Sequence, residues 1–389
     1  MTDQLTVLLA GGGTGGHIFP NAAVLERLRE ADAGEPEKSR VTGHFILSRR
    51  PLDGQIADGL GVEWTSIVAE PFGLRPRVLW RFLSGFGEAK RQVRGVIARN
   101  GGNPGLRGAQ PSALGRTVMV ATGGFVSGPA VRAAKACSVP VALVNLDAVP
   151  GRANAWLAGQ VDKVFSVYEH ASLRGAERVG LPLRRTAVRG DVEPEQARCE
   201  LSLLPDRRTL LVTAGSQGAV SINRAMMALC EHDAVRSALR ERWQVMHLAG
   251  ESMRDEVAKA YAAAGIEANV LAFCDTMGLA WRSADLAITR AGAGSVAEAW
   301  ANRVPSVFLP YPYHKDEHQR LNAQPMVDTG GAVLLRDRVE PTANVSELAP
   351  LLGPMLTADD RLMEMRAALD RDPPGDGAQA VADWVLGQA

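Results

Sequence analysis

Three glycine-rich turns constrain the fold of this chain more than any other feature of its sequence. Each turn follows an apolar, strand-like run and precedes a helical pattern. Glycine lets the backbone come close to a ligand, and the N–H groups at a helix start attract an anion. The sequence therefore predicts an α/β protein with several anion-binding turns. The turns are 11–16 after the run 5–9, 215–218 after 209–213, and 292–294 after 286–289.

Strand-like runs rich in β-branched residues alternate with helical patterns through all 389 residues. Apolar strands separated by helices are typical of parallel sheets that are covered on both faces. Both halves of the chain begin with a strand, a glycine turn and a helix, so we expect two Rossmann-like domains. The expected strands are 5–9, 44–47, 117–121, 139–144 and 163–167 in the first, and 209–213, 244–248, 269–273, 286–289 and 304–309 in the second.

The domain boundary is expected where Gly180-Leu181-Pro182 meets a charged stretch. We predict an N-terminal domain at 1–182, a linker at 183–208 and a C-terminal domain at 209–389. Residues 345–389 are predicted as two helices separated by Pro373-Pro374-Gly375, and the last helix is a candidate to cross back onto the first domain. The stretch 100–116 is rich in Gly, Pro and Ser, which indicates a surface insertion.

The charge balance argues against a nucleic-acid partner. Lys and Arg total 43 and Asp and Glu total 43, so the chain lacks the basic excess of a nucleic-acid-binding protein. No apolar run reaches the ~18 residues of a transmembrane helix. We expect no signal peptide, because the first residues carry no basic segment. The four cysteines form no CxxC pair, which favours reduced thiols. We expect neither a metal nor a cofactor.

The turn at 11–16 differs from two familiar phosphate-binding patterns. The second predicted strand ends in Leu47-Ser48-Arg49-Arg50, without the acid of a dinucleotide fingerprint, and no Lys-Ser/Thr pair of a P-loop follows the glycines. The turn is expected to hold another phosphate, or to be a tight turn without a ligand. His17 follows it, where the helix dipole lowers the pKa of a histidine. His17 is therefore a candidate base, or else it hydrogen-bonds its own loop.

The two later turns carry candidates for nucleotide binding. The Ser216 hydroxyl and nearby backbone N–H groups are suited to a phosphate oxygen. Glu298 is expected in the first turn of the helix that follows 292–294. There it either complements the helix dipole or accepts hydrogen bonds from both hydroxyls of a ribose.

Five loops occur in an order that is specific, although each loop alone is a weak signal. They are Gly13-Thr14-Gly15-Gly16-His17, the run 122–129, Gly215-Ser216-Gln217-Gly218-Ala219, the run 292–298, and His314-Lys315-Asp316 followed by Gln319 and Asn322-Ala323. This set resembles the loops of the MurG family of N-acetylglucosaminyltransferases, within glycosyltransferase family 28. The resemblance extends over most of the chain, to about Leu335.

The resemblance implies a GT-B fold, with two Rossmann-like domains that face each other across a cleft. It implies inverting transfer of GlcNAc from UDP-GlcNAc to the MurNAc 4-hydroxyl of lipid I (undecaprenyl-pyrophosphoryl-MurNAc-pentapeptide) in peptidoglycan biosynthesis. The acceptor pyrophosphate is expected at Thr14, Gly15 and Gly16, with His17 as a candidate base. Loop dipoles and a cation, rather than a chelated metal, are expected to stabilise departing UDP. Donor contacts are expected at Arg184, Ser216, Gln217, Gly218, Phe273, Cys274, Ala293, Gly294, Ser295, Val296, Glu298, His318 and Gln319.

Two positions depart from the family pattern. Val144-Asn145-Leu146-Asp147 stands where the family has a His-Glu-Gln-Asn run, and only Asp147 keeps a polar side chain at the Asn position. Asp147 is a candidate base or sugar contact, or else a loop or helix-capping residue. His318 replaces a Gln and still offers a hydrogen-bond donor. These departures leave open a related GT-B enzyme with another lipid or metabolite acceptor, and a non-catalytic nucleotide-sugar sensor.

A lipid-linked acceptor requires contact with a bilayer, and residues 71–99 suit that contact. Between Arg75 and Arg99 there are seven basic residues and one acid, interspersed with apolar side chains that include Trp80 and Phe82. Such a stretch favours an anionic membrane surface by roughly 1 kcal/mol per basic residue. The alternative is a core-packing helix with a solvated basic face. We expect a peripheral protein at the cytoplasmic face of the inner membrane.

Overall fold

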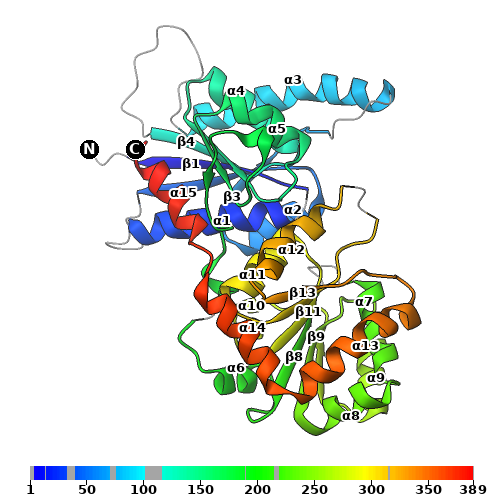
Figure 1. The fold of residues 1–389 in the computed structure, drawn as a ribbon. Helices are drawn as coiled ribbons and strands as arrows, with labels where there is room; N and C mark the ends of the chain where they lie inside the picture. Colours follow the sequence, from blue (N-terminus) through cyan, green and yellow to red (C-terminus); the bar gives the residue numbers. More distant parts are fainter. Residues whose placement is uncertain are drawn as a thin grey trace. The chain divides into compact units, whose positions relative to one another are not determined.

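The chain divides into two compact α/β units, Met1–Arg184 with Gly375–Ala389 and Arg185–Pro374 (Figure 1). The computed structural model describes residues 4–13, 15–32, 40–70, 76–100, 116–188, 190–213, 219–313 and 316–388, and only the backbone of 76–84. The expected linker, 183–208, is divided between the units after Arg184. The expected insertion at 100–116 lies almost entirely outside the described residues.

The first unit contains a parallel sheet in the order β3-β2-β1-β4-β5-β6-β7. Helices α3, α4 and α5 lie on one face, and α1 and α15 lie on the other (Figure 1). The strands are β1 (Leu5–Ala10), β2 (Val41–Leu47), β3 (Glu63–Ser66), β4 (Arg116–Ala121), β5 (Val141–Asn145), β6 (Lys163–Ser166) and β7 (Glu177–Arg178). The helices are α1 (Gly15–Ala31), α2 (Pro51–Gly59), α3 (Pro76–Arg99), α4 (Gly124–Ala136), α5 (Arg152–Leu157) and α15 (Gly377–Leu386).

The second unit contains a parallel sheet in the order β10-β9-β8-β11-β12-β13. The strands are β8 (Arg208–Thr213), β9 (Trp243–Leu248), β10 (Ala268–Leu271), β11 (Leu286–Thr289), β12 (Ser306–Phe308) and β13 (Ala332–Leu334). The helices are α6 (Pro194–Glu200), α7 (Val220–Leu229), α8 (Asp233–Arg242), α9 (Arg254–Ala264), α10 (Met277–Ser283), α11 (Ala293–Ala301), α12 (His318–Asp328), α13 (Pro341–Thr357) and α14 (Asp359–Arg371).

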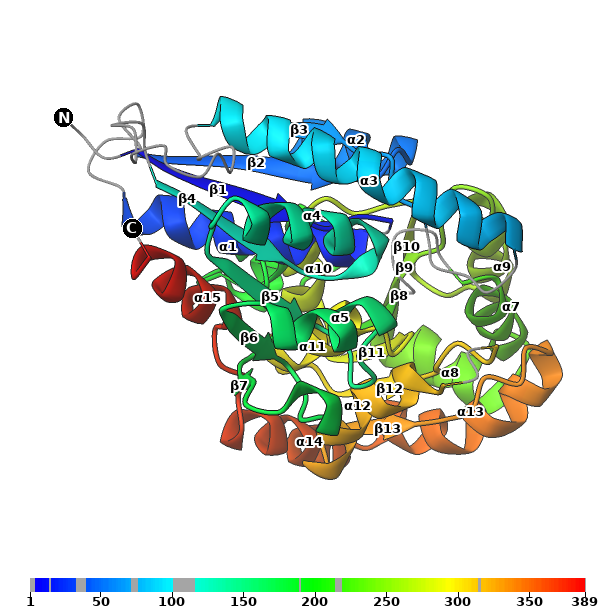
Figure 2. The same cartoon turned by 90° about the horizontal axis from the view of Figure 1, so that it is seen from above.

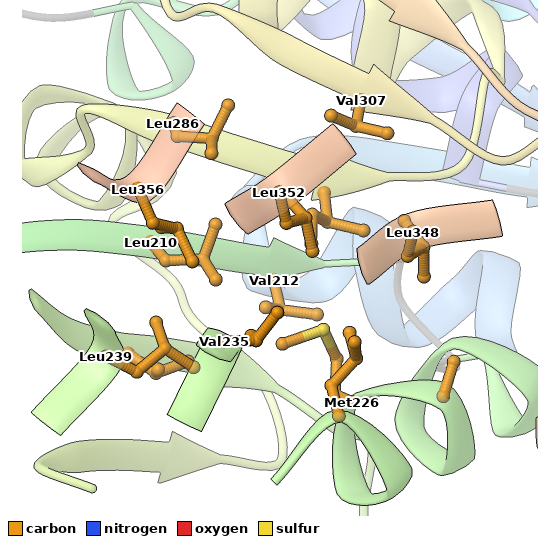
Figure 3. Packing of buried hydrophobic residues seen from close by; sticks show 14 of the residues in the cluster. Leu210, Val212, Met226, Val235, Leu239, Leu286, Val307, Leu348, Leu352 and Leu356 are labelled. Carbon is orange, nitrogen blue, oxygen red and sulfur yellow. The ribbon is translucent and has the colours of Figure 1, made fainter. Parts of the chain in front are cut away.

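Apolar side chains from the second sheet pack against α7, α8 and α13 (Figure 3). Leu210 and Val212 of β8 and Leu352 of α13 belong to this cluster, and all three are fully buried. Their burial follows from the sequence pattern, because a strand covered on both faces is apolar along its whole length. Each fully buried Leu or Val stabilises the fold by about 1.5–3 kcal/mol. This core fixes the strand ends from which the functional turns emerge.

The prediction of two parallel-sheet α/β domains is confirmed, with differences at the sheet edges and near the C-terminus. Strands β3, β7 and β13 escape prediction because they contain only 4, 2 and 3 residues. Residues 345–389 were predicted as two helices, which is wrong. They contribute to three helices, because Ala358 has extended backbone and two acids then begin α14. The last helix, α15, packs beside α1 of the first unit (Figure 2).

Helix α3 begins within the segment expected to contact a membrane. In its described C-terminal half, Ala89, Val93, Val96 and Ile97 are fully buried in the core of the first unit. Their spacing follows the helical period, so this half is a core-packing helix whose opposite face carries charged residues. The side chains of 71–84 lie outside the described residues. Within the described residues, no helix is both long and apolar enough to cross a membrane.

Candidate active site

Two glycine turns of the first unit lie side by side at the carboxyl edge of its sheet. One turn follows β1 and the other follows β4, and Ala10 of β1 is in register with Ala121 of β4. Gly13, Gly123 and Gly124 have φ values of +95°, +107° and +75°. A Cβ atom at Gly124 would lie 2.8 Å from the carbonyl oxygen of Gly12. Glycine is thus required here both by backbone conformation and by the close approach of the two turns.

His17, in the first turn of α1, joins these two glycine turns. Its Nδ1 lies 3.0 Å from the carbonyl oxygen of Thr122, and the Thr122 hydroxyl donates to the carbonyl oxygen of His17 at 2.7 Å. A carbonyl oxygen only accepts, so Nδ1 of His17 carries the hydrogen and Nε2 is the bare nitrogen of the neutral ring. The sequence-based alternative, a histidine bonded to its own loop, does not describe this geometry.

The electrostatic surroundings of His17 also favour the neutral ring. Burial lowers the pKa of His17 below its usual value, while the charge of Asp147, the Thr122 carbonyl and the charge of Asp53 partly oppose that shift. The lowered pKa agrees in direction with the expectation from the helix dipole, but burial is its main cause. A neutral imidazole with a bare Nε2 is able to accept a proton from a hydroxyl group.

Asp147 lies in the loop between β5 and α5, and its charge acts on His17. It is not a helix cap, because the N-cap of α5 is Gly151. The Asn145 side chain donates to the Asp147 carbonyl oxygen at 2.8 Å and to the Ser166 hydroxyl at 3.1 Å. Asn154 donates to the side chain of Asn145 at 3.2 Å. Asn145, which sequence reasoning passed over, therefore anchors the loop that carries Asp147.

Two other residues of the first unit surround the same loops. Asp53, in the first turn of α2, is fully buried, and its carboxylate accepts a hydrogen bond from the N–H of Gly13 at 2.8 Å. Sequence reasoning missed Asp53, because Asp53 is 40 residues from Gly13 in the sequence and contacts the turn only in the folded chain. Arg184 donates to Glu26 at 3.1 Å, and its guanidinium lies 5.8 Å from the centre of the Phe19 ring. Its contact with a nucleotide stays a prediction.

In the second unit, the glycine turn after β11 leads into α11. Gly292 is the N-cap of α11 and has no side chain to offer to the first N–H groups of the helix. Cβ atoms built at Gly292 or Gly294 would touch nothing within 4 Å. Such a helix start is open to a ligand and favours an anion. Ala293, Gly294, Ser295 and Val296 form the first turn of this helix, and their contact with the donor stays a prediction.

Glu298 projects from the same helix toward α10. The prediction that it lies in the first turn of α11 is wrong, because the helix begins at Ala293 and Glu298 is in its second turn. Its Oε2 accepts a hydrogen bond from the indole N–H of Trp281 at 2.8 Å. Burial raises the pKa of Glu298 to about 7, against the effect of the Trp281 hydrogen bond. The carboxylate therefore does not serve to complement the helix dipole at the first turn.

A buried ion pair lies behind the turn. Arg290 donates to Asp337 at 2.6 Å and to the Ser221 hydroxyl at 2.7 Å, and Ser221 also donates to Asp337 at 2.6 Å. Burial acts to raise the pKa of Asp337, but hydrogen bonds from Ser221, Asn344, Val339 and Arg290 outweigh it and the pKa is lowered. This network joins the turn after β11 to the start of α7.

The remaining predicted donor contacts lie in separate loops of the second unit. Phe273 is 53% exposed and Cys274 is buried, both between β10 and α10. Gln319 accepts a hydrogen bond from the backbone N–H of Tyr311 at 2.8 Å, and Nδ1 of His318 lies 2.8 Å from Asp316. Thr14, Ser216, Gln217, Gly218 and His314-Lys315 lie outside the described residues. The described residues contain no group of three or more His, Cys, Asp or Glu side chains able to hold a metal ion.

Two Rossmann-like domains, each with a glycine turn at the carboxyl edge of its parallel sheet, are the architecture of the GT-B fold. Solved structures share this fold: MurG from Acinetobacter baumannii matches with a TM-score of 0.70 at 22% identity, covering 99% of both chains. The calicheamicin glycosyltransferase CalG4 matches with a TM-score of 0.61 at 13% identity, covering 100% of this chain and 98% of that one.

The sequence comparisons assign the chain to one family. The N-terminal domain model of glycosyltransferase family 28 matches residues 7–166, and the C-terminal domain model matches residues 209–379. A Clavibacter sepedonicus relative is 34% identical over 385 residues, covering 97% of this chain and 95% of its own. A Geobacter metallireducens relative is 30% identical over 393 residues, covering 98% of both. Both are named UDP-N-acetylglucosamine--N-acetylmuramyl-(pentapeptide) pyrophosphoryl-undecaprenol N-acetylglucosamine transferase. The chain belongs to glycosyltransferase family 28.

Proposed function

We propose that this enzyme transfers GlcNAc from UDP-GlcNAc to the MurNAc 4-hydroxyl of lipid I, giving lipid II. The names of relatives that are similar over nearly the whole chain support the two substrates. The geometry of His17 carries the chemistry, because the Thr122 carbonyl fixes the hydrogen on Nδ1 and leaves Nε2 as a base. The peptidoglycan precursor is therefore the acceptor, and the reaction is an acid–base-assisted displacement.

In this proposal the acceptor pyrophosphate binds the glycine turn of the first unit. Gly15 and Gly16 are the first two residues of α1, so their N–H groups belong to a helix start that favours an anion. The MurNAc 4-hydroxyl then lies near Nε2 of His17. Its oxygen attacks the anomeric carbon of GlcNAc, its proton passes to Nε2, and the bond from the anomeric carbon to UDP breaks with inversion. The charge of Asp147 stabilises the imidazolium that forms.

The donor nucleotide binds the second unit. The backbone N–H groups at the open start of α11 bind a phosphate group of the nucleotide. The carboxylate of Glu298 accepts hydrogen bonds from the ribose hydroxyls. The exposed Phe273 and the backbone of Cys274 meet the uracil, and His318 and Gln319 meet the sugar. The departing UDP gains its stabilisation from helix and loop dipoles together with a cation.

The enzyme works at a membrane surface because its proposed acceptor is lipid-linked. We place it as a peripheral protein at the cytoplasmic face of the inner membrane, with the basic segment 71–99 against anionic lipids. The described half of α3 has two distinct faces. One face is fully buried in the core, and the exposed side carries Arg99 and Arg91, of which Arg91 pairs with Glu88.

An acceptor comparison separates this function from its alternatives. Purified enzyme is supplied with UDP-GlcNAc and either lipid I or a simple glycolipid acceptor. We expect transfer to lipid I and little to the others. Transfer only to another acceptor would favour a related GT-B enzyme. UDP-GlcNAc binding with neither hydrolysis nor transfer would favour the nucleotide-sugar sensor.

A further inference from the structure

We propose that Asp53 is a positioning residue for the acceptor half of the reaction, because with Arg50 it holds both backbone polar groups of Gly13 and so fixes the turn that leads into His17. This inference rests on the proposed function for its kinetic consequences. The clamp itself is a structural relationship that is measurable without turnover.

The start of α2 supplies both parts of the clamp. Oδ2 of Asp53 accepts the N–H of Gly13 at 2.8 Å and the hydroxyl of Ser48 at 2.5 Å. Arg50, the N-cap residue of α2, donates from Nη1 to the carbonyl oxygen of Gly13. One short segment of the chain thus holds the donor and the acceptor of a single turn residue.

The turn is shaped around this carboxylate. Gly13 has a φ of +95°, a backbone conformation that residues with a Cβ rarely adopt, and glycine is also the most flexible residue, so the two contacts from α2 restrict a position that is otherwise free to move. A Cβ atom at Gly12 would lie 2.7 Å from Oδ2 of Asp53. The clamp also reaches the second glycine turn, because the Arg50 guanidinium lies 5.6 Å from the centre of the Phe125 ring at the start of α4.

Stability alone does not account for a carboxylate at this position. Asp53 is fully buried, and its Oδ1 has no hydrogen-bond partner among the described residues. A buried acceptor without a partner destabilises a fold, and such groups call for an explanation. The negative charge of Asp53 also acts on His17, where it supports the basicity of the ring together with Asp147 and the Thr122 carbonyl.

The test compares Asp53→Ala and Asp53→Asn with Asp58→Asn. Asp58 lies on the same helix and accepts a hydrogen bond from the Trp64 indole at 2.8 Å, away from the glycine turn. We expect Asp53→Ala to lower kcat/KM for lipid I at least tenfold, with KM for UDP-GlcNAc within twofold of wild type. Asp53→Asn retains an oxygen for the Gly13 N–H and should recover part of the loss. Asp58→Asn should behave as wild type.

Deuterium uptake provides the readout that does not depend on activity. In Asp53→Ala, a peptide that contains Gly13 should exchange at least tenfold faster, while peptides from the second unit keep their wild-type rates. Arg50→Gln should also speed exchange at Gly13, but by less than Asp53→Ala. This variant tests the clamp if Asp53→Ala does not fold. Unchanged uptake at Gly13, or equal kinetic losses for donor and acceptor, would overturn the proposal. A different result would contradict the proposed function and leave the clamp intact: wild-type enzyme transfers no GlcNAc to lipid I, while Asp53→Ala still speeds deuterium uptake at Gly13.

Discussion

The indole N–H of Trp281 donates to Oε2 of Glu298 at 2.8 Å, which ties α10 to α11 beside the open glycine turn. Burial nevertheless raises the pKa of Glu298 to about 7. The carboxylate is therefore only about half ionised near neutral pH. In the proposed site the ribose hydroxyls donate hydrogen bonds to the ionised carboxylate, so nucleotide binding should be coupled to the protonation of Glu298.

The affinity for UDP should increase as the pH rises from 6 to 8. With a pKa of about 7, the ionised fraction of Glu298 grows about tenfold over this range. Calorimetric titration at several pH values measures the effect. Glu298→Gln is the control, because it keeps the shape of the side chain and leaves only the titration of UDP itself. Identical pH profiles in wild type and Glu298→Gln would contradict this role of Glu298.

Replacing His17 by Asn should lower kcat at least 100-fold, since general base catalysis is worth about 10²–10⁴ in rate. The Asn amide is able to donate to the Thr122 carbonyl as Nδ1 does, so the loop contact is kept while the base is lost. UDP affinity should stay at the wild-type value, because the proposed nucleotide contacts lie in the second unit. A variant that retains more than a tenth of wild-type kcat would exclude His17 as the base.

The pH profile of kcat/KM should distinguish His17 from Asp147. The rate should fall as the pH drops through the lowered pKa of His17, below 6.5. Asp147→Asn removes a charge that raises this pKa, so the acid limb should move to lower pH with a smaller loss at neutral pH than in His17→Asn. A loss as large as that of His17→Asn, without a shift of the limb, would identify Asp147 as the base.

Asp337→Ala should lower the free energy of unfolding of the second unit by about 3–5 kcal/mol, because it leaves Arg290 buried without its partner. The matched control is Arg338→Ala, which breaks the partly exposed pair with Glu347 and should cost no more than about 1 kcal/mol. Denaturant titration measures both variants. Equal, small losses would show that the buried pair does not stabilise the strand ends.

Arg77→Gln combined with Arg81→Gln should weaken binding to anionic vesicles about 30-fold, at roughly 1 kcal/mol for each basic residue. Flotation with phosphatidylglycerol vesicles measures binding, and phosphatidylcholine vesicles give the background. Arg254→Gln with Arg320→Gln, on the second unit, is the control with the same change of charge. A loss of binding in the control pair alone would place the membrane contact elsewhere.

Sequence pattern predicts the central strands of both sheets well, because a strand buried on two faces must be apolar along its length. The sequence also predicts the glycine turns, since they lie between such strands and helices. It does not predict the short edge strands. Strand β7, Glu177–Arg178, has only two residues, both exposed, and pairs because the neighbouring strand is already in place.

The sequence predicts a site residue only where the residues next to it in the chain indicate its role. The position of His17 after the turn marks it as a candidate base, but its tautomer depends on the Thr122 carbonyl, 105 residues away. Asp53 and Trp281 gain their importance from contacts across the fold, so nothing in their local sequence marks them. The placement of Glu298 failed by one helical turn, because α11 begins at Ala293, inside the glycine turn, and not after it.

The most direct test of the central claim is the formation of lipid II from UDP-GlcNAc and lipid I by the purified enzyme, with the linkage of the product determined by NMR. We predict that the lipid fraction gains one GlcNAc, β-linked to the MurNAc 4-hydroxyl, and that His17→Asn forms the same product at least 100-fold more slowly. Absence of a disaccharide product from wild-type enzyme that binds UDP-GlcNAc, or an α-linked product, would contradict the account.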